Sequence, residues 1–383
     1  MEPPSRLARI PAFLWWAVPV GVGLATRLIV CFVADLPWDS VDTRIYGWMA
    51  RAILEGEPRS FAPNGYPLFL AGLLSVVPST AIVPVVQSLN VLWGAATVGL
   101  TYAIARALDR QPVAALAAMI VAVYPHPINY TRFLLTEVPT TFLLMLALYG
   151  VLRAHQTSSW RWSAGAGIVL GLALMLRTAL APVAAGIGIL ALWMGSVRTL
   201  VLPYGVGLVL ILGAHSLAVS TGHLASSSNL HVNLLIAIAD DPDEVIASAP
   251  RFTDAERASA VPAYLRHARE TPAAFAGERL RTVWDLWSPW PQDRGAADRP
   301  LWQNALLGLR FPLLVVGLAG LALHRRKPIA WLLACPALAT TALFAFFFAL
   351  PRFTFIAEPG LAILCALALA AVVRRHPSRS ASA

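Results

Sequence analysis

The chain has 383 residues, of which 58% are hydrophobic and only 13% are charged, and its mean hydropathy is +0.66. This apolar share is too high for an ordinary soluble domain. The formal net charge of +9 does not indicate a nucleic-acid-binding protein, because the arginines are spread along the chain and form no single basic patch. The composition therefore predicts an integral membrane protein.

Continuous apolar runs predict transmembrane helices, since a helix needs about 20 mainly apolar residues to cross a bilayer. Barrel strands would instead alternate apolar and polar residues. The first run is too long for a secretion signal and is followed by no small-residue cleavage pattern, so we expect it to be retained. We expect an all-α bundle of about ten spans, at residues 12–34, 80–105, 112–128, 133–152, 163–177, 179–195, 199–220, 301–323, 329–349 and 353–373.

Basic residues at the ends of these spans predict the orientation. Counted from a cytoplasmic N-terminus, the inner connections receive most of the arginines, as the positive-inside rule expects. Both termini are then cytoplasmic, and the acidic residues near the membrane lie on the outer face. The inner residues are Arg6, Arg9, Arg106, Arg110, Arg153, Arg161, Arg198, Arg325, Arg326, Lys327, Arg374 and Arg375.

This topology divides the chain into four parts. The N-terminal membrane module is 1–220 and includes the first outer loop at 35–79. An outer section follows at 221–300, then the C-terminal spans at 301–373 and a cytoplasmic tail at 374–383.

The first outer loop opens with DLPWDSVDTRIYGWMA, which brings Asp35, Asp39 and Asp42 close together. Apolar residues then recur at helical spacing, so we expect a helix lying flat on the bilayer surface. Asp39 or Asp42 could cap this helix, because Asp favours that position. A second apolar helix, over 66–77, is too short to span.

The outer section contains the polar stretch SSSNLHVNLL, the acidic turn ADDPDE and a charged stretch, from Ala263 to Trp284, that we expect to be helical. It closes with WDLWSPWP, whose tryptophans suit the lipid–water boundary. Asn229 and Asn233 could hydrogen-bond a sugar or satisfy the loop backbone. We expect this section to cover a site on the membrane and to select the acceptor.

Ionisable residues at membrane depth are candidate functional groups, since each costs about 3 kcal/mol even on lenient insertion scales. Glu137 could simply be a carboxylate favoured by the helix dipole, and Arg27 could pair with Asp35 or Glu137. Glu137 shares the outer face with the three aspartates and several arginines, and this favours a chemical role for it. The residues concerned are Arg27, Arg132, Glu137, Arg177, Arg352 and Glu358.

Arg132, Arg177 and Arg352 fall on the outer face, where the positive-inside tendency would not place them. A guanidinium forms paired hydrogen bonds to phosphate oxygens and keeps its charge in a low dielectric. A nearby carboxylate can remove the proton of an acceptor hydroxyl as a bond to a sugar carbon forms, while arginines stabilise the departing phosphate. Acids and arginines on one face therefore predict group transfer from a phosphate-bearing donor.

The order of several motifs carries a family resemblance. They are DTRIYGWMARAILEG, NGYPLFLAGLL, SLNVLWGAATVGLTYAIARAL, YPHPINYTRFLLTEVPTTFLLML, GLALMLRTALAPVAAG and PRFTFIAEPGLAILCAL, and they span most of 24–373. This series resembles the GT-C superfamily of polyprenyl-phosphate-sugar-dependent glycosyltransferases. It is most similar to the bacterial family 39 group, which includes protein O-mannosyltransferases and the lipid A aminoarabinose transferase.

The resemblance implies residue roles. Asp42 matches the first-loop acid assigned as catalytic base, and Glu137 matches the second-loop acid that shapes the acceptor or donor site. Asp39 could replace or assist Asp42, because the family's adjacent Asp-Glu pair is absent and Thr43 follows Asp42. Arg177 and Arg352 match basic positions facing the donor phosphate, with Arg132 a further candidate. Substrate-site candidates are Tyr46, Tyr66, His126, Tyr130 and Asn229.

The resemblance also implies a function. A sugar would pass from a polyprenyl-phosphate donor to a hydroxyl of a protein, lipid or glycan, with inversion, on the outer face of a bacterial inner membrane. DSVD does not match the metal-binding Asp-x-Asp of oligosaccharyltransferase relatives, so no metal is expected to be required. Asp39, Asp42 and Glu137 could still gather a divalent cation. A transporter or lipid flippase, and an assembly protein without activity, are the alternatives.

Overall fold

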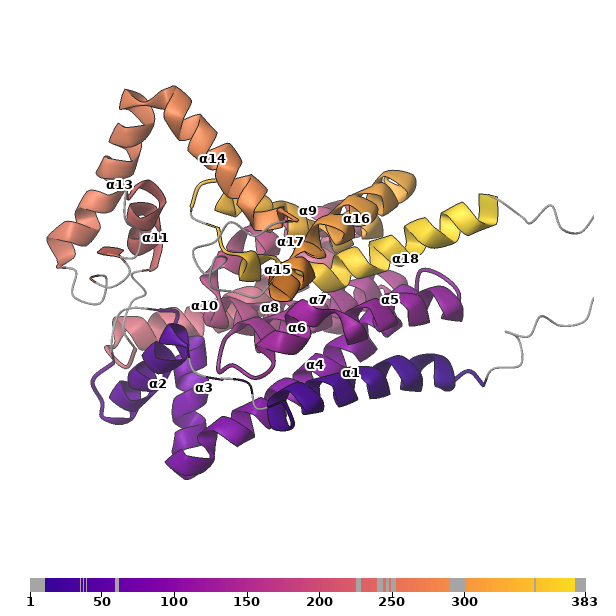
Figure 1. Ribbon diagram of the computed structural model, residues 1–383, viewed down its shortest axis with the longest axis horizontal. Coiled ribbons are helices and arrows are strands. Elements are labelled where there is room, and N and C mark those ends of the chain that lie inside the picture. Colours follow the sequence, from indigo (N-terminus) through magenta and orange to yellow (C-terminus); the bar gives the residue numbers. More distant parts are fainter. Residues whose placement is uncertain are drawn as a thin grey trace, which may run out of the picture.

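A computed structural model describes residues 11–375 except 35, 37, 39, 59–61, 225–228, 240–243, 246–247, 249–252, 290–300 and 348. In this described part the regular structure is helical and contains no strand. The long helices run side by side as a bundle (Figure 1). They are α1 (Leu14–Phe32), α4 (Ile82–Arg106), α5 (Gln111–Val123), α7 (Glu137–Thr157), α8 (Trp160–Leu176), α9 (Ala181–Met194), α10 (Leu202–Ser220), α16 (Arg310–His324), α17 (Pro328–Phe344) and α18 (Glu358–Arg375).

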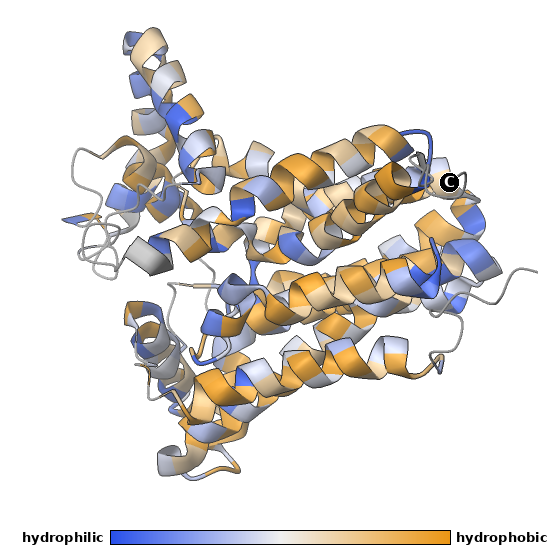
Figure 2. Ribbon diagram, turned by 45° about the vertical axis from the view of Figure 1, so that its right-hand side comes forward, coloured by the Kyte–Doolittle hydropathy of each residue, from blue (hydrophilic) through white to orange (hydrophobic). Residues whose placement is uncertain are grey.

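The predicted all-α membrane fold is confirmed. Among the described residues, six helical stretches are long and apolar enough to cross a membrane, and five further apolar helices are shorter. Figure 2 shows hydrophobic residues along the bundle helices and hydrophilic ones mainly toward its ends. The six long stretches are Leu14–Phe32, Ser79–Arg106, Glu137–Thr157, Val197–Ser220, Asn304–His324 and Pro351–Arg374.

Several expected spans are interrupted by short turns. The expected span 112–128 is divided because Tyr124, before Pro125, takes an extended backbone (φ −69°, ψ 119°) between α5 and α6 (Pro125–Tyr130). The span expected at 301–323 is divided between α15 (Leu301–Gly308) and α16, and the last span opens with the 3₁₀ segment η6 (Pro351–Ala357). Shorter turns are η2 (Ser79–Ala81), η3 (Thr178–Leu180) and the π-helical turn η4 (Val197–Val201).

Five helices lie at one end of the bundle. The first outer loop forms α2 (Val41–Leu54) and α3 (Gly65–Leu74), and the outer section forms α11 (Asn229–Ile238), α13 (Asp254–Glu270) and α14 (Pro272–Trp287). The charged stretch expected to be helical from Ala263 to Trp284 is helical, but it is divided between α13 and α14. Thr271 (φ −130°, ψ 57°) ends α13, and Pro272 begins α14 because proline cannot continue the preceding helix.

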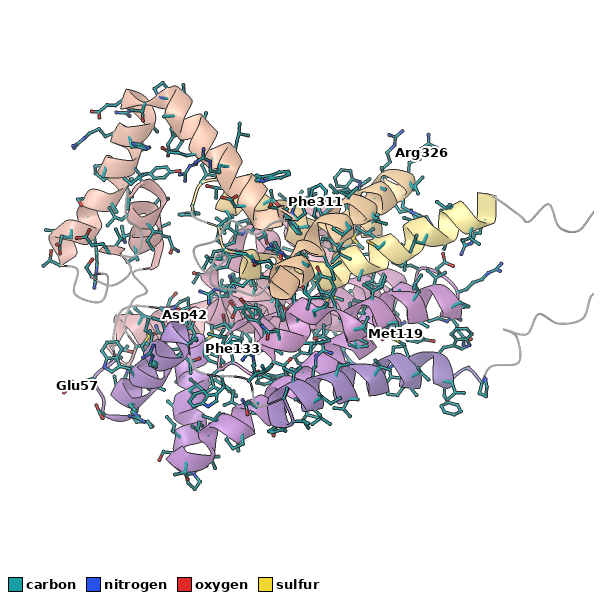
Figure 3. All side chains as sticks on the ribbon, in the orientation of Figure 1. Asp42, Glu57, Met119, Phe133, Phe311 and Arg326 are labelled. Carbon is teal, nitrogen blue, oxygen red and sulfur yellow. The ribbon has the colours of Figure 1, made fainter. Side chains whose placement is uncertain are left out.

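The two ends of the bundle carry different residues. Asp42 lies at the end that bears α2 and α13, whereas Arg326 lies at the opposite end (Figure 3). α1 begins and α18 finishes at that same opposite end (Figure 1). There, Arg374 Nη2 lies 2.5 Å from Asp109 Oδ1, which ties the end of α18 to the turn between α4 and α5.

Small residues set the close packing of helices on which the site depends. A Cβ at Gly167 of α8 would lie 2.1 Å from the Tyr204 carbonyl oxygen, and a Cβ at Gly207 of α10 would lie 2.2 Å from that of Ala164. Glycine thus lets α8 and α10 approach backbone to backbone. α8 also packs on α7, so the start of α7 and the end of α8 meet at the α2 end of the bundle.

Candidate active site

Asp42 is positioned by the N-terminus of α2. Ser40 caps this helix, because its Oγ accepts a hydrogen bond from the Thr43 N–H at 3.1 Å. The cap is therefore neither Asp39 nor Asp42, the two alternatives expected from the sequence. Asp42 lies in the first turn, where the helix dipole favours a carboxylate, and its side chain remains available to other partners.

Glu137 and Arg177 meet where α7 begins and α8 ends. Glu137 is the first residue of α7 and is 3% exposed. Arg177 takes an extended backbone (φ −149°, ψ 99°) directly after α8. Its Nη1 donates to Glu137 Oε1 at 3.1 Å. The antiparallel packing of neighbouring helices thus joins residues 40 positions apart.

Arg352 links the two acids. It lies in η6, and its Nη1 is 2.5 Å from Asp42 Oδ2 while its Nε is 3.7 Å from Glu137 Oε1. The four side chains of Asp42, Arg352, Glu137 and Arg177 form a row of alternating charge, which we call the charge row. Arg352 Nε is buried and has no hydrogen-bond partner. This leaves one guanidinium donor unused within the charge row.

The charge row lies in the wall of a cavity of about 200 Å³. Tyr46 of α2 contributes to the same wall, and Val232, Asn233 and Ile236 of α11 line it as well. Phe353 also lines the cavity and stacks on Phe344 with ring centroids 4.3 Å apart. The Cζ atoms of Arg177 and Arg352 lie 4.9 and 5.7 Å from the Phe353 ring centroid, so one aromatic ring supports both guanidinium groups.

Tyr46 is held in its neutral form. Burial raises the pKa of Tyr46, and the negative charges of Asp42 and Glu137 raise it further. A phenol with a raised pKa stays protonated near neutral pH and can donate a hydrogen bond. Tyr46 therefore offers the cavity a hydroxyl donor beside Asp42.

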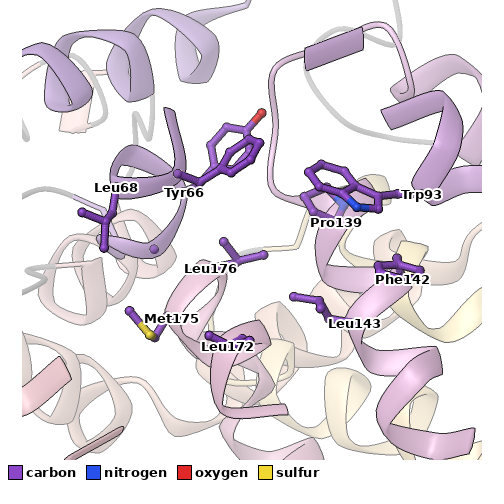
Figure 4. Close-up of a pocket in the computed structure, with 11 residues that line it drawn as sticks. Tyr66, Leu68, Trp93, Pro139, Phe142, Leu143, Leu172, Met175 and Leu176 are labelled. Atoms are coloured by element: carbon purple, nitrogen blue, oxygen red, sulfur yellow. The ribbon is translucent and has the colours of Figure 1, made fainter. Parts of the chain in front are cut away.

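An apolar pocket of about 310 Å³ adjoins this cavity (Figure 4). Leu176 lines both spaces, and Tyr66 of the pocket makes an edge-to-face contact with Tyr46, with ring centroids 5.1 Å apart. The Tyr66 hydroxyl is buried and has no hydrogen-bond partner. The other residues that line the pocket are Gly65, Leu68, Phe69, Trp93, Pro139, Phe142, Leu143, Leu172 and Met175.

Other candidates from the sequence lie outside the cavity wall. Arg132 donates from Nε to Asn129 Oδ1 at 3.2 Å and lies over the Phe133 ring at 4.4 Å. Tyr130 packs in an aromatic group with Phe133 and Phe355. Asp39 lies outside the described residues, as does the side chain of Asn229.

Two further candidates from the sequence are buried outside the cavity wall. A pairing of Arg27 with Asp35 or Glu137 was one alternative; Asp35 lies outside the described residues, and Arg27 Nη1 donates to the Gly23 carbonyl at 2.9 Å while its Nη2 lies 3.5 Å from that of Val121. His126 was a substrate-site candidate in a polar loop. It is instead 2% exposed, and its Nδ1 lies 2.5 Å from Glu358 Oε1.

Many of the residues that line the cavity were not predicted from the sequence, and Phe353, Val232 and Ile236 are among them. The spacing of Val232, Asn233 and Ile236 places them on one helix face, a signal present in NLHVNLLI. No sequence pattern indicated that this face meets the first outer loop. Phe353 follows Arg352 in the sequence, but no pattern there predicts that its ring lines a cavity.

The described residues contain no group of three or more His, Cys, Asp or Glu side chains able to hold a metal ion. Asp42 and Glu137 each have an arginine as a close ionic partner. In this arrangement the guanidinium groups of the two arginines pair with the two carboxylates.

Comparisons with known proteins agree with the architecture. Residues 63–219 match the family described as dolichyl-phosphate-mannose-protein mannosyltransferase. No curated protein sequence matches the chain at a significant level. The oligosaccharyltransferase of Archaeoglobus fulgidus in its apo form is similar in structure, with a TM-score of 0.58 and 13% identity over 97% of this chain and 52% of that one.

A second structure is that of archaeal oligosaccharyltransferase AglB from the same organism, in complex with an inhibitory peptide and a dolichol-phosphate. It has a TM-score of 0.53 and 14% identity over 96% of this chain and 51% of that one. The chain spans about half the length of these enzymes. The predicted resemblance is thus confirmed by a mannosyltransferase family match over 63–219 and by a fold similar to that of a membrane oligosaccharyltransferase over nearly the whole chain.

Proposed function

We propose that this GT-C protein transfers a sugar from a polyprenyl phosphate to an acceptor hydroxyl in the cavity beside the charge row. The observation that carries this proposal is the meeting of Asp42 with Arg352, and of Glu137 with Arg177, from four distant segments. A base and phosphate-binding cations are the groups such a transfer needs. The dolichol-phosphate in the AglB complex supports a lipid-phosphate ligand for this fold.

Asp42 is the base in this proposal. Its carboxylate takes the proton of the acceptor hydroxyl while the acceptor oxygen bonds to the anomeric carbon. The bond from that carbon to the donor phosphate oxygen breaks, and its electron pair leaves with polyprenyl phosphate. Because the acceptor attacks opposite the leaving group, the anomeric configuration inverts. Glu137 orients Arg177 and shapes the donor side of the cavity.

Arg352 and Arg177 stabilise the departing phosphate, on which negative charge grows. In the structure Arg352 is bound to Asp42, but its buried Nε has no hydrogen-bond partner. A donor phosphate therefore competes with Asp42 for this guanidinium. When Arg352 turns to the phosphate, Asp42 is released to accept a proton, so donor binding prepares the base.

The apolar pocket receives the part of the lipid chain nearest the phosphate. It shares Leu176 with the polar cavity, so a chain lying there would direct its phosphate toward Arg177. Its lining includes Trp93, Phe142 and Leu172, which offer no charge to the lipid. Burial of apolar chain there contributes about 25 cal/mol per Å² of surface removed from water.

We place the active end on the outer face of a bacterial inner membrane, with both termini cytoplasmic. The basic connections at the far end of the bundle support this orientation. The acceptor is a hydroxyl of a protein, lipid or glycan that reaches the cavity past α11. The peptide in the AglB complex supports a peptide as one such class for a related fold.

The decisive experiment compares the native protein with Asp42→Asn in detergent or liposomes. Donors are polyprenyl-phosphate monosaccharides, offered with mixed acceptors, and the readout is release of polyprenyl phosphate. We expect release by the native protein and a loss of about 100-fold or more in Asp42→Asn, because a positioned base contributes about 10²- to 10⁴-fold.

Glu55→Gln is the matched control, since Glu55 is an exposed acid at the other end of α2. Both variants should insert in the membrane as the native protein does. Full activity of Asp42→Asn would remove Asp42 as the base. Movement of labelled lipid across liposomes without release of polyprenyl phosphate would favour a flippase instead.

A further inference from the structure

A buried polar pair lies outside the cavity wall and takes no part in the proposed reaction. His126 of α6 and Glu358, the first residue of α18, are both 2% exposed. The distance of 2.5 Å from His126 Nδ1 to Glu358 Oε1 places a hydrogen bond between them. Burying such groups costs free energy unless they are hydrogen-bonded, and here they bond to each other. They belong to helices 232 residues apart in sequence.

This pair holds the segment η6 from two sides. The Thr354 hydroxyl of η6 lies 3.1 Å from Glu358 Oε1, the same oxygen that His126 contacts, and 3.0 Å from the Pro351 carbonyl oxygen. The His126 ring also meets the Phe355 ring edge to face, with centroids 5.5 Å apart. Side-chain contacts thus join α6 and α18 to the middle of η6.

Arg352 projects from the start of the same segment. The Phe353 N–H donates to the Leu350 carbonyl at 2.9 Å, and the Phe353 ring stacks on Phe344. The backbone of Arg352 is therefore held between the Phe353 stack on one side and the Thr354–Glu358–His126 contacts on the other. Its guanidinium extends from this support to Asp42.

We propose that His126 and Glu358 are positioning residues that fix η6 so that Arg352 reaches the reacting phosphate. This inference rests on the proposed function of Arg352. A displacement of about 1 Å at a catalytic group can cost about 100-fold in rate. Loss of the His126–Glu358 bond lets η6 shift and misplaces Arg352, although neither His126 nor Glu358 lines the cavity.

The first test uses His126→Phe and His126→Asn. Phenylalanine keeps the ring but removes Nδ1, whereas the asparagine amide nitrogen can take the place of Nδ1 and donate to Glu358. We expect His126→Phe to lower kcat by about 10-fold or more, because Arg352 is misplaced. His126→Asn should recover most of this loss. Cys365→Ala is the matched control, a buried change on α18 whose Sγ contacts the Leu313 carbonyl and not η6.

The second test separates positioning from general loss of stability. In an Arg352→Lys background, His126→Phe should have little further effect on kcat, because both changes act through the same guanidinium. Full additivity of the two losses would overturn the proposal. Equal activity of His126→Phe and the native protein would also overturn it.

The third test does not depend on activity. Hydrogen–deuterium exchange should be faster in 351–357 of His126→Phe than in the native protein and unchanged there in Cys365→Ala. Unchanged exchange in His126→Phe would overturn the proposal.

If the native protein transfers no sugar, the proposed function fails, yet this exchange still decides whether the pair fixes η6. If His126→Phe does not fold, Thr354→Val, which removes the hydroxyl next to Glu358, takes its place in the same assays.

Discussion

Single residues in the cavity have sharply different surroundings even when they are neighbours. Tyr46 and Tyr66 pack edge to face. The Tyr46 side chain lines the polar cavity next to Asp42, whereas the Tyr66 hydroxyl is buried without a hydrogen-bond partner. A buried polar atom without a partner costs about 1 to 3 kcal/mol, so the same chemical group should have opposite effects at these two positions.

We predict that Tyr46→Phe lowers kcat/KM by about 10-fold, because it removes a hydrogen-bond donor from the cavity. Tyr66→Phe should leave activity unchanged and raise the free energy of unfolding by up to about 1 kcal/mol. The raised pKa of Tyr46 keeps its hydroxyl protonated. Its ionisation should therefore cause no loss of activity up to about pH 9, below the ordinary tyrosine pKa of about 10. Steady-state kinetics and thermal unfolding check these outcomes, and equal effects of both variants would contradict them.

The secondary elements around the cavity are tied together by one arginine of the outer section. Arg279 of α14 donates from Nη2 to the Ala237 carbonyl near the end of α11 at 2.7 Å. Its Nη1 donates to the Phe347 carbonyl at 3.2 Å, in the segment that leads to η6. A cation at the C-terminus of α11 is favoured by the helix dipole. Arg279 thus connects α11 to the segment that leads to η6, and residues of both α11 and η6 line the cavity.

We predict that Arg279→Met loosens α11, because methionine fills similar space but donates no hydrogen bond to the Ala237 carbonyl. The KM for the acceptor should rise by about 5-fold or more, while donor binding changes less. Arg281→Met is the control, since Arg281 is an exposed cation on the same helix. Faster proteolysis or hydrogen exchange of 229–238 in Arg279→Met alone would support this role. Identical acceptor kinetics in the two variants would argue against it.

At the scale of the whole molecule, a polar cavity and an apolar pocket adjoin at the same end of the bundle. The polar cavity is built from the first outer loop, the bundle helices and α11, whereas the apolar pocket is built from α3, α4, α7 and α8. A lipid phosphate has the same two parts, a charged head and an apolar chain. The juxtaposition therefore suits a ligand of that kind better than a water-soluble sugar nucleotide.

We predict that Leu172→Trp, which fills the apolar pocket, raises the KM of a long-chain polyprenyl donor by about 10-fold. A donor with a chain too short to reach the pocket should be affected little. Ile168→Trp is the matched control, because Ile168 lies one turn earlier on α8, is also exposed and does not line the pocket. Equal losses with both donors would place the lipid chain elsewhere.

The sequence by itself determined the class of this protein. Its apolar runs predict an all-α membrane bundle, because each must bury its backbone polar groups in a helix. The acids of the first loop and the outer arginines were also visible, since charges are rare in such a chain. Asp42, Glu137, Arg177 and Arg352 were chosen from this pattern together with the family resemblance. Their roles stay predictions.

Only the tertiary structure decided which of these charges meet. Arg177 and Arg352 lie beside Glu137, whereas Arg132 bonds to Asn129 and His126 is buried against Glu358. Residues 42, 137, 177 and 352 are brought together by helix packing, which includes close approaches such as that of Gly150 on α7 to Ala166 on α8. The local sequence determines where a helix lies along the chain and which of its faces is apolar. The partner of a charged side chain is determined by segments that can be hundreds of residues away, and such long-range contacts leave no local pattern in the sequence.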